Sequence, residues 1–186
     1  MEINHLIAQD LYRYYSNISY RGKIKTVFSH SGARFMFLYR MCSKYPRKSF
    51  LGFFFRLWFK ILSKNRNIEI PHKCNFGGGL YLGHFMNIII INQNVIIGQN
   101  CNIMQGVTIG NESRGKRKGS PGIGNRVLIG PNSVVVGNIK IGDDVLIGPL
   151  TFVNFDVPEH SVVVGNPAKI VSNKGSKGYI NKILEE

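Results

Sequence analysis

A six-residue repeat fills most of the chain after residue 69 and limits its possible folds more than any other feature. From Ile70 the chain reads IPHKCN, FGGGLY and LGHFMN; after three extra isoleucines at 88–90 it resumes as INQNVI, IGQNCN, IMQGVT and IGNESR, and from Ile123 it continues to VNFDVP. The first position of all thirteen units is Ile, Leu, Val or Phe, the second is often Gly, and the fifth is small or medium. This period is neither that of a helix nor that of a strand. It predicts a β-helix of a little over four coils, with three short strands per coil, inward first positions and glycine at the corners.

The chain divides into three predicted parts: a basic helical segment at 1–66, the β-helix at 67–171 with an inserted polar loop at 111–122, and a tail at 172–186. The net charge of +14 is concentrated in the first part, which holds 13 lysines and arginines against two acids. Such asymmetry indicates an anionic neighbour. Nucleic acid is not expected, because the chain has no recognised nucleic-acid-binding motif. The basic loop at 111–122 is either a solvated surface loop or a flap that touches a phosphate-bearing ligand.

In the helical segment, Pro46 predicts a break that is followed by another helix from residue 50 to 64. The apolar run at 50–62 contains Arg56 and Lys60 and is too short to span a bilayer. Its aromatic face leaves two alternatives open: packing on the β-helix or on a sister subunit, or docking on an anionic membrane with basic side chains at the headgroups. The residues of this face are Phe53, Phe54, Leu57, Trp58 and Ile61.

The beginning of the chain does not have the pattern of a secretory signal peptide. The three cysteines are dispersed, and Cys74 and Cys101 stand at inward fifth positions, so they are predicted to be small core residues rather than disulfide partners or nucleophiles. A reducing, cytoplasmic setting follows, with a peripheral position at the inner face of the membrane as an open alternative. Residues 180–184 are expected to form a short helical turn.

His84 is the strongest candidate for a catalytic residue. It stands at an outward third position of its repeat unit, in the glycine-rich stretch LYLGHFMNI. A lone outward histidine is usually just a surface residue. Here, however, Glu69 precedes it by 15 residues, close to one coil of about 18. A carboxylate on one imidazole nitrogen fixes the tautomer and leaves the other nitrogen free as a general base.

Several motifs follow in a fixed order after Glu69. Gln105, Val107, Thr108 and Gly110 form a Gln-x-Val-Thr-x-Gly pattern, and the β-helix closes with VGNPAKIV at 164–171. With the three-residue slip after His84, residues 68–171 resemble the left-handed β-helix hexapeptide acyltransferases, and within them the serine acetyltransferase branch. The resemblance implies an all-β left-handed parallel β-helix with an N-terminal helical segment.

The resemblance also implies direct acetyl transfer from acetyl-CoA, without a metal, in a homotrimer with active sites between neighbouring β-helices; two trimers could pair. His84 would be the general base and Glu69 its partner. Lys169 would lie near the nucleotide phosphates, and the rest of the acetyl-CoA would follow the coil edges. The residues implied for that edge are Gly110, Asn111, Gly130, Pro131, Gly148 and Pro149.

The residues expected to face the acceptor are Gly83, Asn87, Gln105 and Ser120. Two of them depart from the family pattern: serine acetyltransferases have an acid where this chain has Gly83, and a second histidine where it has Ser120. Both departures argue against free serine. We therefore expect a saccharide hydroxyl as acceptor, in a surface polysaccharide or its precursor.

Four alternatives remain at this point. A serine O-acetyltransferase and an N-acetyltransferase acting on an amino sugar nucleotide share the donor and the fold. Carbonic anhydrases of the same fold need three histidines on zinc, for which the repeats offer only His72, His84 and His160. A non-catalytic scaffold is the fourth.

Overall fold

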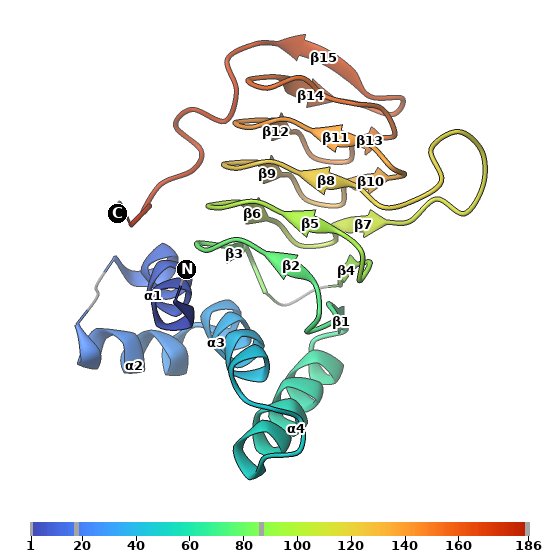
Figure 1. Ribbon diagram of the computed structural model, residues 1–186. Coiled ribbons are helices and arrows are strands. Elements are labelled where there is room, and N and C mark those ends of the chain that lie inside the picture. Colours follow the sequence, from blue (N-terminus) through green and yellow to red (C-terminus); the bar gives the residue numbers. More distant parts are fainter. Residues whose placement is uncertain (1, 17–18, 86–87, 185–186) are drawn as a thin grey trace.

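The computed structural model describes residues 2–16, 19–85 and 88–184. Residues 68–172 form a left-handed parallel β-helix whose strands stack into three sheets, and four helices lie against its first coil (Figure 1). Sheet A has the order β1 (Ile68–Glu69), β4 (Ile89–Ile91), β7 (Thr108–Gly110), β10 (Val134–Val136) and β13 (Phe152–Val153). Sheet B runs through β2 (Asn75–Phe76), β5 (Ile96–Ile97), β8 (Gly122–Ile123) and β11 (Lys140–Ile141). Sheet C runs through β3 (Tyr81–Leu82), β6 (Asn102–Ile103), β9 (Leu128–Ile129), β12 (Leu146–Ile147), β14 (Val162–Val164) and the antiparallel β15 (Lys169–Ser172).

The strand register explains both irregularities of the repeat. Ile90 lies opposite Thr108, which is the regular coil of 18 residues. Ile68 lies opposite Ile89, 21 residues on, because the three extra residues widen the turn before β4. The loop between β7 and β8 projects from the β-helix in the same way (Figure 1), and its ends are closed by an antiparallel bridge between Glu112 and Gly119.

The predicted inward positions are confirmed. The first residue of every repeat unit is buried, and so are the fifth-position residues Cys74, Val95, Cys101, Val107, Val127, Ser133, Val145 and Thr151. Together these residues fill one continuous core. Such burial contributes about 1.5–3 kcal/mol for each large aliphatic side chain.

The four helices cover the end of the β-helix at which the first coil would otherwise expose its interior. They are α1 (Ile3–Tyr15), α2 (Tyr20–Ser29), α3 (Ser31–Lys44) and α4 (Phe50–Asn65). Pro46 lies between α3 and α4 as predicted, and α4 begins at Ser49, whose hydroxyl accepts from the Gly52 N–H at 3.0 Å. The ring of Tyr39 stacks on Phe76 of the first coil with centroids 5.1 Å apart. The helical segment therefore belongs to the same core as the β-helix.

Side chains from the helices also satisfy backbone groups at the open strand edge of the first coil. Arg40 donates to the carbonyls of Phe76 at 2.8 Å and Gly77 at 2.5 Å, and it pairs with Asp10 at 2.8 Å. The Asp10 carboxylate in turn accepts from the Leu80 N–H at 3.1 Å. An unpaired strand edge would cost free energy and invite pairing with other chains, so the helices cap the solenoid chemically as well as sterically.

Two sequence expectations need correction. The aromatic face of α4 does not pack on the β-helix, because Phe53, Phe54 and Leu57 are exposed in the single chain. Residues 180–184 form no helical turn; the tail is irregular there and returns to α1, where Lys182 donates to the Tyr14 carbonyl at 3.3 Å (Figure 1). Among the described residues, no helix combines the length and the apolar character needed to cross a bilayer.

Candidate active site

His84 lies directly after β3, where the chain turns from sheet C to sheet A, and its side chain is exposed. Its backbone has a φ of 47°, in the left-handed region that non-glycine residues adopt uncommonly. Such strained backbone is often found at functional sites. We refer to the stack of turns from sheet C to sheet A as the C–A corner.

The strand register aligns several predicted residues along this corner. Leu82 pairs with Ile103, Ile103 with Ile129, and Leu128 with Leu146. Two residues after each of these inward strand residues, the corner therefore presents His84, Gln105, Pro131 and Pro149 in one column.

The column is long enough for an extended ligand. It continues past β14 to Lys169, whose strand residue lies opposite Val164. Four coil spacings separate its ends, or roughly 19 Å at the usual distance between neighbouring strands. Five of the predicted acetyl-CoA residues, Gly130, Pro131, Gly148, Pro149 and Lys169, thus lie along one edge with His84 at its end.

Glycine is required on this edge because neighbouring coils approach closely. A Cβ at Gly130 would lie 2.8 Å from the backbone carbonyl carbon of Gly148, closer than carbon atoms normally approach. Gly130 N–H also donates to the Ile147 carbonyl at 2.8 Å. Glycine at this position therefore keeps the edge flat.

Glu69 is the outward residue of β1 and is exposed. Its strand pairs with β4, which follows His84, so both residues belong to the first coil. No hydrogen bond joins the Glu69 carboxylate to the His84 imidazole in the single chain. Glu69 instead borders an open cleft of about 670 Å³ between α4 and the first coil, whose wall includes the basic residues Arg47, Lys60 and Lys73.

Two predicted acceptor residues show specific surroundings near His84. Gly83 is buried, and a Cβ there would lie 2.6 Å from the Met104 sulfur, so the thioether occupies the space of a side chain at position 83. The Gln105 Oε1 atom is buried without a hydrogen-bond partner in the single chain, so it can accept a bond from a ligand. Asn87 lies outside the described residues.

The remaining predicted residues lie at the opposite edge of sheet A. Gly110 ends β7, and Asn111 begins the projecting loop. The Ser120 hydroxyl lies 3.1 Å from Asn92 Oδ1 and 3.5 Å from Asn111 Oδ1. Within one chain, sheet A separates these residues from the column at the C–A corner.

Neither metal nor cysteine chemistry is indicated within the described part of the chain. No group of three metal-binding side chains occurs in residues 2–16, 19–85 and 88–184. His160 is engaged with Asp144 at 2.9 Å. Burial raises the pKa of Cys101 to about 12 and of Cys42 and Cys74 to about 11, which keeps the thiols protonated at neutral pH.

Met104 is the functional candidate that the sequence reasoning missed. It stands opposite Gly83 only when the pairing offset of 21 residues in this coil is known. The three extra isoleucines were the available signal, because adding them to the regular coil gives this offset.

Comparisons with known proteins converge on one family. A family model described as "Bacterial transferase hexapeptide (six repeats)" matches residues 120–154. A "Serine acetyltransferase" of Helicobacter pylori (strain ATCC 700392 / 26695) is 32% identical over 152 residues, which cover 82% of this chain and 88% of that protein.

Solved structures agree. The crystal structure of Neisseria gonorrhoeae serine acetyltransferase in complex with serine has a TM-score of 0.70 and 28% identity, covering 91% of this chain and 69% of that one. The Brucella abortus strain S19 enzyme in complex with Coenzyme A has a TM-score of 0.70 and 26% identity, covering 92% and 68%. Since the coverage exceeds 90% of this chain, the similarity includes the helical segment and is not confined to the repeats.

Proposed function

Because this chain belongs to the serine acetyltransferase family of hexapeptide-repeat acyltransferases, we propose that it transfers the acetyl group of acetyl-CoA to the hydroxyl of L-serine. The observation that carries the proposal is the similarity to the Helicobacter pylori enzyme over 88% of that protein's length. Acetyl-CoA is the co-substrate, and the column at the C–A corner is the surface proposed for it. Serine replaces the saccharide as the first acceptor, because the relatives are named serine acetyltransferases.

The residues at the corner support a direct transfer. The His84 imidazole accepts the proton of the acceptor hydroxyl as the oxygen attacks the thioester carbonyl. The tetrahedral intermediate then expels the CoA thiolate, which takes that proton back from the imidazolium. Hydrogen-bond donors near the corner can stabilise the oxyanion. Glu69 is proposed to orient the imidazole and to stabilise its charged form, once the substrates or a neighbouring subunit order the site.

A trimer would complete the site. Ser120, Asn111 and Gly110 are separated from His84 by sheet A within one chain. If β-helices associate side by side around a threefold axis, this edge of one subunit can meet the C–A corner of the next. We propose that the loop at 111–122 reaches the active site of the neighbouring subunit in this way.

A saccharide hydroxyl remains the second candidate acceptor, because two observations favour it. The acid that family members use next to the histidine is replaced by Gly83, and Met104 fills its space. The cleft beside Glu69 has a volume of about 670 Å³ and a basic wall, and both features suit a ligand larger and more anionic than serine.

The test is thiol release from acetyl-CoA with a panel of acceptors: L-serine, UDP-sugars and surface-polysaccharide oligosaccharides. Turnover with serine and not with saccharides supports the proposal. Turnover with a saccharide alone would overturn it in favour of the second candidate. Turnover with none of them, while acetyl-CoA binds, would contradict both acceptor assignments.

A further inference from the structure

Helix α4 turns an apolar face away from the protein. Phe50 is 83% exposed and Phe53 is 65% exposed, and Phe54, Leu57 and Ile61 are each nearly half exposed. These positions are spaced three or four residues apart, so they share one side of the helix. The opposite side, with Phe59 and Leu62, is buried in the core. The exposed face therefore has no partner within the described chain.

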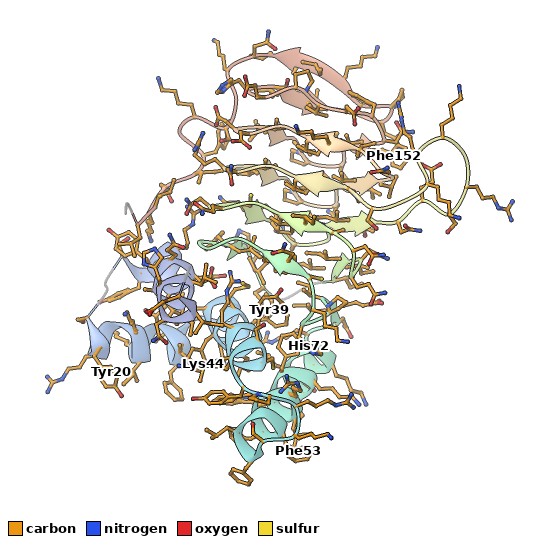
Figure 2. All side chains as sticks on the ribbon, viewed as in Figure 1. Tyr20, Tyr39, Lys44, Phe53, His72 and Phe152 are labelled. Atoms are coloured by element: carbon orange, nitrogen blue, oxygen red, sulfur yellow. The ribbon has the colours of Figure 1, made fainter. Side chains whose placement is uncertain are left out.

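A second apolar stripe lies on α2. Tyr20, Ile24 and Phe28 are spaced one helical turn apart and are 79%, 43% and 67% exposed. Figure 2 shows Tyr20 and Phe53 at the helical end of the molecule, remote from β15. Exposed large apolar side chains are normal when scattered singly, but two such helix faces at one end mark an interaction surface. We call these two faces the helical-end surface.

The charge around the helical-end surface is positive. Of the two acids in residues 1–66, Asp10 is buried against Arg40, which leaves Glu2 as the exposed one. Exposed basic side chains on α2, on α4 and on the turn before α4 are Arg21, Lys25, Arg47, Lys48, Lys60 and Lys64. The surface thus combines aromatic side chains with neighbouring cations, the composition of helices that lie in the interface of an anionic bilayer.

We propose that the helical-end surface docks on an anionic membrane, with the apolar residues of α4 and α2 below the headgroups and the lysines and arginines among them. A second copy of the chain fits less well. Pairing two such ends would bring together two segments that each carry 13 basic and two acidic residues. Like charges at that density oppose association, whereas anionic lipids attract them.

Docking can be measured with the protein's own fluorescence, because Trp58 is the single tryptophan and lies on α4. We expect a blue shift and co-sedimentation with vesicles of phosphatidylcholine containing about one third phosphatidylglycerol. Vesicles of pure phosphatidylcholine should bind much less, and high salt should release the protein. Failure to bind the anionic vesicles at low salt would overturn the proposal.

Variants separate the surface from the enzyme. Phe53→Ser combined with Leu57→Ser should weaken vesicle binding at least about tenfold, while Val171→Ser, which changes an exposed residue of β15, should not. Lys48→Glu combined with Lys64→Glu should weaken it similarly, and Lys177→Glu in the tail should not. Acetyl transfer to a soluble acceptor should stay unchanged in all four, so a failure of docking is distinguishable from a failure of the proposed function.

The competing occupant has its own signature. Sedimentation without lipid would show a doubled assembly mass if a second copy covered the helical-end surface. Loss of that doubling in the Phe53→Ser and Leu57→Ser variant, without vesicle binding by the unmodified protein, would assign the surface to a protein interface and overturn the proposal.

Discussion

Replacing Asp10 with alanine should destabilise the protein strongly, because this carboxylate holds the cap of the β-helix in place. Asp10 is fully buried, and Arg40 is 4% exposed. The guanidinium donates to Asp10 at 2.8 and 3.3 Å, and the Leu80 N–H donates to the same carboxylate at 3.1 Å. Burial raises the pKa of Asp10, and the neighbouring Arg40 charge opposes that rise.

The magnitude follows from what the substitution leaves behind. Asp10→Ala leaves a buried guanidinium without its counter-ion and a backbone N–H without its acceptor. Removing one partner of a buried ion pair costs about 3–5 kcal/mol of the free energy of unfolding. For a chain of this length, that loss lowers the melting temperature by about 10 °C.

The assay is thermal or urea unfolding followed by far-UV circular dichroism at one fixed protein concentration, since assembly would contribute to stability. Asp156→Ala is the matched control, because this exposed carboxylate accepts one bond, from the Lys140 N–H at 2.8 Å. It should cost about 1 kcal/mol or less. A double change, Asp10→Leu with Arg40→Met, should recover much of the loss. A cost below about 1 kcal/mol for Asp10→Ala, or a double variant no more stable than the single one, would refute the reasoning.

Three further predictions concern the site, the tail and acid stability. Glu69→Gln should leave acetyl-CoA binding intact but slow thiol release about tenfold or more; an unchanged rate would show that another group orients the histidine. Gly175→Ala should free the C-terminal tail, because φ is 62° there and a Cβ would collide with Asp144; faster tryptic cleavage after the tail lysines would reveal it, and an unchanged rate would contradict the docking. The Asn125 N–H and side-chain amide lower the pKa of Asp143, so its contribution to stability is present above about pH 4 and is lost as the pH falls further. Acid-unfolding curves should therefore be shallower below that pH for Asp143→Asn, and superimposable curves would be evidence against this role.

The β-helix could be predicted because each coil depends on local pattern. An inward position such as Ile97 or Ile129 is set by the six-residue period alone, and the core that results is continuous. The widened turn before β4 was visible as three extra isoleucines. The break at Pro46 and the helix that follows it were also recoverable, since both rest on the backbone restriction of proline and on apolar spacing.

The cap and the surroundings of His84 could not be predicted in the same way. Arg40 and Asp10 are 30 residues apart, and Asp10 and Leu80 are 70 apart, so nothing in the local pattern links them. The contact of Met104 with Gly83 depends on a coil offset that only the register reveals. Which face of α4 is buried was decided by the packing of α3 and the first coil, not by the helix itself.

The most direct test of the account is the rate of thiol release from acetyl-CoA by the His84→Ala variant, with the acceptor that the panel identifies. A general base contributes about 10²–10⁴-fold to the rate, and the exposed His84 side chain supports no core contact, so the variant should fold normally and lose activity by that factor. His160→Ala, which changes an exposed histidine bonded to Asp144, should keep the full rate. A folded His84→Ala protein with a rate near that of the unmodified protein would contradict the placement of the chemistry at the C–A corner.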